Sequence, residues 1–315
     1  MRHARRKKGA HAFNMCNTVG TGMEIMPECI PCLLKRILFQ ARLADNGTEF
    51  DALRAAMAAF SEGLREGRNS AEMATEVHKA AYRAMGVKDP YIRLKIRADE
   101  VAGEHIDDAS EHISSSGDRI RAAILIASVG NVMDFGIGKA IDDPDEFRKE
   151  FRGLIGQGIG HDDTEAVKEI LSRAKSVVYL FDNCGESQMD KLLIREIRKA
   201  GTRVTGVVRG EPILNDVTLS DAERIGLDKE TDSLHTTSEF RIGINLDALT
   251  ADLRNEMASA DLIISKGMAN FESLSDQDVP VPVAFILRSK CVPVADALGI
   301  PTGVNAVVLK YPGSV

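Results

Sequence analysis

Short apolar runs alternate with helix-like stretches through the second half of this chain of 315 residues. The runs lie at 176–183, 203–210, 261–267, 281–289 and 305–310. The first of them, SVVYLFDN, is apolar almost throughout, which is typical of a strand that is buried on both faces of a sheet. Strands that alternate with helices predict an α/β fold with a mostly parallel, doubly wound (Rossmann-like) sheet.

In the first half of the chain, no segment shows the alternation of apolar and polar residues that is typical of a strand. CLLKRILFQARLA, at 32–44, places apolar side chains at the spacing of one helix face. The segments 50–64 and 71–85 repeat that spacing, and RIRAAILIASVGNVMDFG, at 119–136, predicts a more deeply buried helix. These patterns predict an N-terminal helical part that packs onto the sheet.

These two patterns predict that the chain is divided into three parts. We expect a disordered basic tail at 1–25, a helical subdomain with a CxxC motif at 26–160, and an α/β domain at 161–315 whose chemistry is indicated by the motifs described below.

Charge and hydropathy narrow the classes of partner. The formal net charge is −7, although residues 1–22 carry five basic residues and no acidic one. The rest of the chain therefore stands at −12, which argues against a nucleic-acid groove. The longest apolar run outside the tail, AAILIA at 122–127, is too short to cross a bilayer, so we expect no membrane span.

The basic tail has no apolar segment long enough for a secretory signal. It is either disordered or an upstream start that precedes a true start at Met23 or Met26. Five cysteines at irregular spacing are typical of reduced thiols rather than of a disulfide framework. Together these features predict a cytoplasmic protein.

Polar side chains follow three of the expected strands. Asp182 and Asn183 end the first strand, Asp216 follows the second, and Lys266 follows the third. In open α/β sheets the ligand crevice lies beyond the carboxyl ends of the strands. Two carboxylates crowded there repel each other unless a cation lies between them, and a hard divalent ion accepts carboxylate and amide oxygens. Asp182, Asn183 and Asp216 are therefore candidate metal ligands, although Asp182 would also suit a helix cap or a turn.

Two further segments carry candidate catalytic groups. Asn131 and Asp134 lie three residues apart near the end of the helix expected at 119–136, where a plain helix end would look the same. KGMANFESL carries Lys266, Asn270 and Glu272. A lysine beside a glycine after a strand suits a phosphate group, and the alternative is a solvated loop.

ECIPC, at 28–32, is a CxxC motif formed by Cys29 and Cys32. Two thiolates are half of a tetrahedral zinc site, and Cys291 follows a strand at the edge where Asp182 lies. A structural or second metal site, redox use and inert thiols all remain open. If the first helix covers that edge, the three thiols lie close together.

Six motifs occur in one order: PECIPCLLKR, SVGNVMDFG, YLFDNCGE, LNDVTLSDA, SKGMANFESL and LRSKCVPVADALG. Together they resemble the metal-dependent damage-control phosphatase family, long catalogued as a domain of unknown function. The resemblance is closer to its short stand-alone branch with an N-terminal CxxC, and it covers 26–311.

The resemblance implies a phosphatase that hydrolyses phosphomonoesters of small metabolites, either sugar phosphates or damaged ones. It implies a divalent metal (Mn²⁺, Mg²⁺, Co²⁺ or Ni²⁺) held by Asp182, Asn183 and Asp216. The metal would polarise the phosphoryl group and activate a water.

On this interpretation Lys266 supplies a second positive charge, and Asn131 and Asn270 donate hydrogen bonds. Asp134 or Glu272 orients the water. Asp182 as a covalent nucleophile stays open.

Two other functions compete with this one. The first is a carboxyl methyltransferase that uses S-adenosylmethionine, an activity proposed for some relatives, although DNCGE has only one glycine where a glycine-rich loop is expected. The second is a metal- or cluster-carrying binding protein centred on the CxxC.

Deletion of residues 1–22 should leave the melting temperature and the activity nearly unchanged. The segment has no apolar periodicity and carries five like charges, so it cannot supply a packed element. Thermal unfolding of the full and shortened chains checks this, and a loss of several degrees would contradict it.

Overall fold

A computed structural model describes residues 23–136, 143–275 and 277–313. The expectation for the tail 1–22 lies outside these residues. The helices of the first half are α1 (Cys29–Ala44), α2 (Glu49–Gly63), α3 (Ser70–Met85), α4 (Ile92–Gly103), α5 (Ile106–Ser115), α6 (Arg119–Gly130) and α7 (Pro144–Gly156). Those of the second half are α8 (Thr164–Leu171), α9 (Glu186–Arg198), α10 (Leu219–Ile225), α11 (Ala251–Ser259), α12 (Gly267–Leu274) and α13 (Val292–Leu298), with the 3₁₀ turns η1 (Leu227–Lys229) and η2 (Leu246–Ala248).

One sheet holds all the described strands. They are β1 (His161–Asp162), β2 (Ser176–Leu180), β3 (Arg203–Val208), β4 (Ser233–Thr236), β5 (Leu262–Lys266), β6 (Val283–Arg288) and β7 (Asn305–Lys310). Their order is β1-β7-β6-β5-β2-β3-β4, and every neighbouring pair is parallel except β6 and β7. The predicted α/β fold with a mostly parallel sheet is confirmed.

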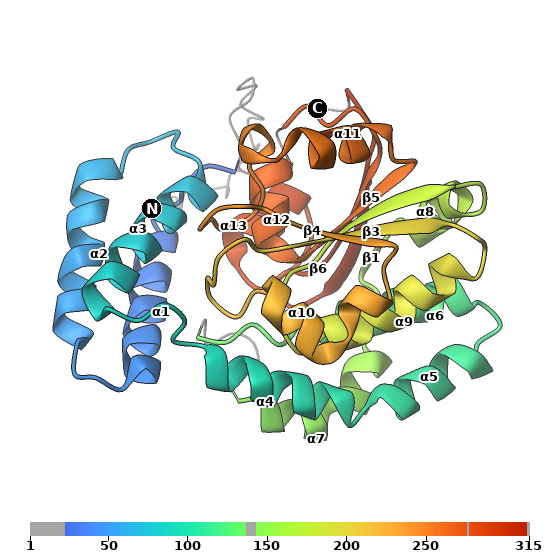
Figure 1. Ribbon diagram of the computed structural model, residues 1–315, viewed down its shortest axis with the longest axis horizontal. Coiled ribbons are helices and arrows are strands. Elements are labelled where there is room, and N and C mark those ends of the chain that lie inside the picture. Colours follow the sequence, from blue (N-terminus) through green and yellow to red (C-terminus); the bar gives the residue numbers. More distant parts are fainter. Residues whose placement is uncertain (1–22, 137–142, 276, 314–315) are drawn as a thin grey trace, which may run out of the picture.

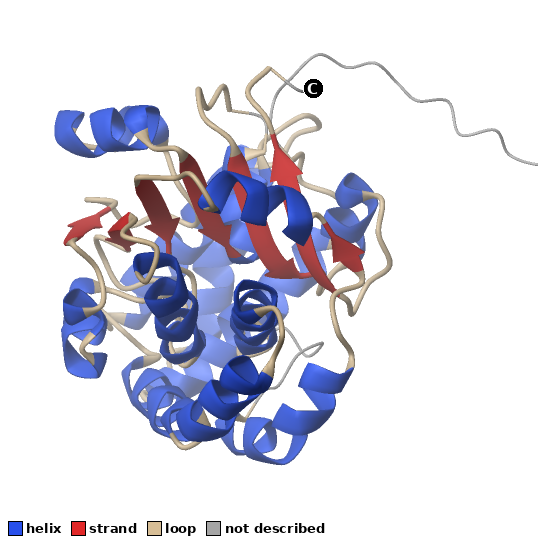
Figure 2. Ribbon diagram, turned by 90° about the vertical axis from the view of Figure 1, so that its right-hand side faces the viewer, coloured by secondary structure: helices blue, strands red, loops and turns tan. Residues whose placement is uncertain are grey.

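Alternate residues of the central strands bury opposite faces of the sheet, as the pleat requires. Val177 and Tyr179 of β2 join the core that also contains side chains of α6 and α9. Val178 and Leu180 join a second core beneath α11, α12 and α13. The sheet is thus a middle layer between two groups of helices (Figure 2). This explains why β2 is apolar at consecutive positions.

The helical first half divides between two places. Helices α1, α2 and α3 pack around a core of their own and lie beside the sheet (Figure 1). Helix α6 packs along α9 and against β6 and β7, and α4 packs on α9 and α7. Helix α3 also contacts α12, which places the α1–α3 unit against one end of the sheet. The domain boundaries given above stay a prediction.

Several elements differ from the sequence interpretation. The short strands β1 and β4 were not anticipated, because β1 has two residues and β4 is polar and only half-buried. The helix expected at 119–136 ends at Gly130, and Asn131 is its C-cap. Asp134 therefore lies on the turn beyond the helix rather than on a helical face.

None of the described helices is both long and apolar enough to cross a membrane.

Candidate functional site

In a sheet of this topology the ligand crevice is expected at the junction of β2 and β5, where the strand order reverses. From β2 the chain runs outward through β3 to β4, and it then returns to β5 on the other side of β2. This reversal is the kind of switch point at which doubly wound sheets bind ligands. Asp182 follows β2 here, and Lys266 is the last residue of β5.

Backbone pairing joins the loops that follow β2 and β3. Asn183 and Asp216 form an isolated antiparallel bridge. The N–H of Val217 donates to the carbonyl of Asp182 at 2.8 Å, and the N–H of Cys184 donates to the carbonyl of Asn215 at 2.8 Å. The three candidate metal ligands Asp182, Asn183 and Asp216 are thereby held next to one another.

The Asp182 carboxylate is 5% exposed and has unequal oxygens. Its Oδ2 accepts hydrogen bonds from Nδ2 of Asn183 at 2.7 Å and Nδ2 of Asn131 at 3.1 Å. Its Oδ1 lies 4.0 Å from Nη2 of Arg209. Burial, and next the charges of Asp216 and Glu186, raise its pKa well above the ordinary value. The fold thus buries a carboxylate whose charge is not fully neutralised by protein groups.

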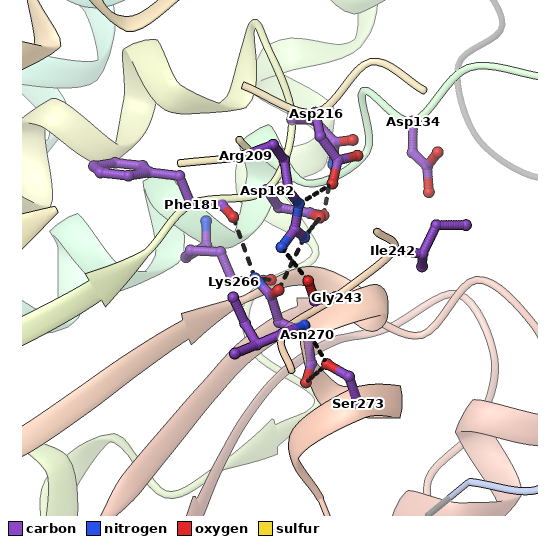
Figure 3. A network of polar contacts seen from close by, with 12 residues as sticks. Asp134, Phe181, Asp182, Arg209, Asp216, Ile242, Gly243, Lys266, Asn270 and Ser273 are labelled. Atoms are coloured by element: carbon purple, nitrogen blue, oxygen red, sulfur yellow. Dashed lines mark hydrogen bonds and ion pairs between the residues drawn. The ribbon is translucent and has the colours of Figure 1, made fainter. Parts of the chain in front are cut away.

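Arg209 lies at the centre of the contacts in Figure 3. Its Nε donates to Oδ2 of Asp216 at 2.6 Å, its Nη1 to the carbonyl of Gly243 at 2.7 Å, and its Nη2 to Oδ1 of Asn270 at 2.9 Å. The pKa of Asp216 is nevertheless raised, because burial outweighs the attraction of Arg209. The sequence analysis missed Arg209, although it follows β3 just as Asp182 follows β2.

Lys266 has a different environment from the one expected. Its fully buried ammonium lies 2.8 Å from the carbonyl of Ala127, 2.7 Å from Oδ1 of Asp190 and 2.6 Å from Oε1 of Glu186. The first two contacts are hydrogen bonds and the third is an ion pair, so the ammonium is engaged between α6 and α9. We therefore revise the interpretation of Lys266 from phosphate ligand to internal counter-ion of Glu186 and Asp190.

The amides of Asn131 and Asn270 are likewise engaged. Nδ2 of Asn131 donates to Asp182 and, at 2.8 Å, to Oε2 of Glu186, while its Oδ1 accepts from the N–H of Arg288 at 2.9 Å. Nδ2 of Asn270 donates to the carbonyls of Phe181 at 3.2 Å and Lys266 at 2.8 Å. In this arrangement both amides position the cluster, and neither has an N–H left for the phosphate contact that we expected.

Asp134 faces the cluster from the turn after α6, without a bond to Asp182 or Asp216 (Figure 3). Its carboxylate pairs with Nη2 of Arg36 at 2.5 Å and with Nζ of Lys290 at 3.0 Å. Although burial opposes ionisation, these two cations lower the pKa of Asp134. The charge of Lys290 partly offsets the rise in the pKa of Asp182.

Arg36 and Lys290 were not recognised in the sequence. Arg36 comes from α1, and its buried Nε has no hydrogen-bond partner among the described residues. Lys290 follows β6 inside one of the six motifs, but its position alone gave it no role. The sequence does place a second lysine directly after an expected strand, as it does for Lys266, and that pattern could have identified Lys290.

Glu272 lies on α12, where its Oε1 accepts from Oγ of Ser70 at 3.2 Å. Burial raises its pKa to about 7.

The cysteine thiols lie near Glu272. Burial, and then the charges of Glu272, Cys29 and Cys32, raise the pKa of Cys291 to about 12. Within 23–136, 143–275 and 277–313, however, no three His, Cys, Asp or Glu side chains are placed to hold a metal ion. The second metal site stays a prediction.

The donor set after β2 and β3 can be tested for its fit to a divalent ion. The charged side chains buried there are Asp134, Asp182, Glu186, Asp190, Arg209, Asp216, Lys266 and Lys290. With all of them ionised, these five acids and three bases sum to −2, and the partly buried Arg36 brings the sum to −1, so the cluster keeps a net negative charge that a bound cation offsets. Oδ1 of Asp182, Oδ1 of Asp216 and Oδ1 of Asn183 accept no hydrogen bond from the described residues. Hard oxygens of this kind suit such an ion.

Comparisons with known proteins agree on one family. The model of the damage-control phosphatase ARMT1-like domain matches residues 25–305. A damage-control phosphatase of Archaeoglobus fulgidus is 38% identical over 283 residues, covering 89% of this chain and 97% of that protein. A damage-control phosphatase of Pyrococcus horikoshii is 28% identical over 89% of this chain and 96% of its own length. The crystal structure of a DUF89 family protein from Pyrococcus horikoshii superposes with a TM-score of 0.80 at 25% identity, covering 92% of this chain and 99% of that one.

Gly267→Ala should destabilise the fold far more than an ordinary glycine substitution. A Cβ at Gly267 would lie 1.8 Å from Oδ2 of Asp182, and its φ is +73°. Gly226 is the matched control, because its φ is +72° and nothing lies within 4 Å of its Cβ position. We expect about 1–2 kcal/mol for Gly226→Ala and a clearly larger loss for Gly267→Ala in urea unfolding. Equal losses would show that Asp182 does not approach Gly267 closely.

Glu272→Gln should become relatively more stabilising as the pH rises. The folded-state pKa of about 7 lies above the unfolded value near 4.5, so the folded chain retains a proton that the unfolded chain releases. The stability that this proton contributes to the wild type is lost as the pH rises toward 7 and above. The difference in melting temperature, variant minus wild type, should grow from pH 5 to pH 8. An unchanged difference would contradict the shift, and exposed Glu62→Gln serves as the control.

Proposed function

The chain belongs to the damage-control phosphatase ARMT1-like domain family, and on that premise we propose that it is a metal-dependent phosphatase acting on phosphomonoesters of small metabolites. Damaged phosphometabolites and sugar phosphates are the substrate classes we favour. The observation that carries the proposal is the buried excess of carboxylates at the switch point of the sheet. Asp182 and Asp216 are packed together, and burial raises the pKa of both, with the charge of Asp216 adding to the rise for Asp182.

Asp182, Asn183 and Asp216 would hold the ion through the oxygens that carry no protein hydrogen bond. When bound, a divalent ion supplies Lewis-acid stabilisation of the phosphoryl oxygens and lowers the pKa of a water. The amides of Asn131 and Asn183 keep Oδ2 of Asp182 occupied, so Oδ1 is the oxygen presented to the crevice.

Two cations on the outer side of the crevice are the best placed to meet a phosphate. Lys290 has one carboxylate contact, to Asp134, which leaves N–H groups of its ammonium available. Arg36 also meets Asp134 and has a buried Nε without a partner among the described residues. Phosphoryl transfer depends mainly on positioning and charge neutralisation, which these two side chains provide from separate segments.

Asp134 is the group we favour to accept a proton from the attacking water. Arg36 and Lys290 lower its pKa, so it is ionised near neutral pH, whereas burial raises the pKa of Glu272 to about 7. Asp134 also faces Asp182 and Asp216, while Glu272 bonds to Ser70. Asp182 as a covalent nucleophile is the alternative at the same site.

No observation favours the two competing functions. The loop after β2 has one glycine, Gly185, whose N–H is bound by Oδ1 of Asp99 at 2.6 Å rather than free for a nucleotide. For a binding protein centred on the CxxC, the described residues place no group of three His, Cys, Asp or Glu side chains around the thiols of Cys29 and Cys32.

Asp182→Ala and Asp216→Ala should each lower metal-dependent phosphatase activity by at least about 100-fold while the fold survives. Removing Asp182 relieves repulsion in the apo protein, so its melting temperature should change by only a few degrees. Asp216→Ala also leaves the buried Nε of Arg209 without its carboxylate, so its melting temperature should fall further. EDTA should abolish turnover, and Mn²⁺, Co²⁺ or Mg²⁺ should restore it. The assay is phosphate release from a panel of phosphorylated metabolites.

Exposed Asp252→Ala is the matched control, since it removes the same side chain from the start of α11. Wild-type turnover by Asp182→Ala would refute the proposal. Full activity after exhaustive chelation would refute its metal dependence.

A further inference from the structure

A second cavity lies between α3 and the loop that follows β3. Its volume is about 460 Å³. Its main lining side chains are Lys79, Tyr82, Arg83, Lys88, Glu211 and Phe240. It includes none of the candidate metal ligands, and the function proposed above assigns it no role.

The charge of this cavity is opposite to that of the chain around it. Lys79, Arg83 and Lys88 form no ion pair with any acid of the described residues, and Glu211 is the one acid in the lining. The chain as a whole stands at −7, and at −12 without residues 1–22. A local excess of positive charge on an acidic protein attracts anions to that place and away from the rest of the surface.

Two aromatic rings give the cavity a fixed wall. The rings of Tyr82 and Phe240 pack edge to face, with centroids 5.3 Å apart and planes at 71°. The hydroxyl oxygen of Tyr82 accepts the N–H of Leu214 at 3.0 Å, which ties α3 to the loop. The cavity therefore combines a flat, partly apolar face with cations at its edge, as a small anionic metabolite requires.

The same loop connects this cavity to the candidate active site. Arg209 and Asp216 lie at its two ends, and Glu211 and Pro212 line the cavity. Asp216 is four positions beyond Pro212, so their Cα atoms are at most about 14 Å apart. That upper limit is comparable to the length of a small metabolite with an acidic group at each end.

We propose that this cavity binds a second anionic group, a phosphate or a carboxylate, of the same substrate whose phosphoryl group is hydrolysed beside Asp182 and Asp216. The inference rests on the proposed phosphatase function and adds a substrate class to it: phosphomonoesters with a further acidic group at the far end. Arg83 and Lys88 are its specificity-determining residues, because both are exposed at the cavity and unpaired.

The other large cavity does not share these properties. It measures about 400 Å³ and contains Arg65, Arg68 and Arg241. Arg68 pairs with Glu76, and Arg241 lies 3.6 Å from Glu72, so two of its three guanidinium groups are already neutralised.

The test compares three esters on the metal-loaded protein: a hexose 1,6-bisphosphate, a phosphorylated sugar acid, and a hexose 6-monophosphate. The variants are Arg83→Glu, Lys88→Glu and their double, with Lys149→Glu on α7 as the control of equal charge change at an exposed position. Each single reversal should raise KM for the two doubly anionic esters about fivefold, and the double by more than about tenfold, with kcat unchanged. KM for the monophosphate should hardly change. A larger effect on the bisphosphate or on the sugar acid identifies the preferred second group.

Calorimetric binding of the same esters separates this inference from the proposed function. If the wild type releases no phosphate from any ester, the proposed function fails, and a binding preference for doubly anionic esters that the double variant loses still supports the cavity. Equal changes in KM or affinity for all three esters, or the same changes in Lys149→Glu, would overturn the inference. Added salt should weaken binding of the doubly anionic esters most.

Discussion

The burial of more carboxylates than protein cations is the constraint on which this structure depends. Asp182, Asp216, Glu186 and Asp190 lie within one dry cluster, and burial raises the pKa values of Asp182, Asp216 and Asp190, the last to about 7. Such a cluster is costly unless each charge is paired or bonded. Arg209 and Lys266, which are both almost without solvent contact, neutralise part of this negative charge. The remaining negative charge is the basis on which we propose a cation site here.

Two glycines allow these charged side chains to pack closely together. Gly267 has no side chain where Oδ2 of Asp182 must lie, and Gly185 has a φ of +79° with Met133 sulfur 2.9 Å from its Cβ position. Asp99, itself paired with Arg224 at 2.6 Å, bonds the N–H of Gly185 and holds the loop that leads from Asp182 to α9. A site built in this way is rigid before any ligand arrives, and preorganised charge is the main source of electrostatic stabilisation in catalysis.

The sequence was enough to predict which residues lie at the carboxyl edge of the sheet. It was not enough to predict where their side chains point and which groups they contact. Asp182, Asn183 and Asp216 were identifiable because parallel strands deliver their following residues to one edge. Lys266 satisfied the same rule, yet its ammonium turns toward Glu186 and Asp190 on α9, one helix turn apart, which no spacing near Lys266 reveals. Arg36 was unpredictable for another reason: its contact with Asp134 joins α1 to the turn after α6, and only tertiary packing sets that distance.

The position of Arg36 also gives the helical first half a physical role. The inner cations Arg209 and Lys266 are committed to carboxylates, so a negatively charged ligand must be met by cations from outside the cluster. Lys290 reaches it from the end of β6, and Arg36 reaches it only because α1 is packed beside α3, which contacts α12. Asp134 contacts both side chains and offsets one of their two positive charges. The helical unit thus adds Arg36 and Asp134 to a group in which Asp182, Asp216 and Lys290 come from the sheet half.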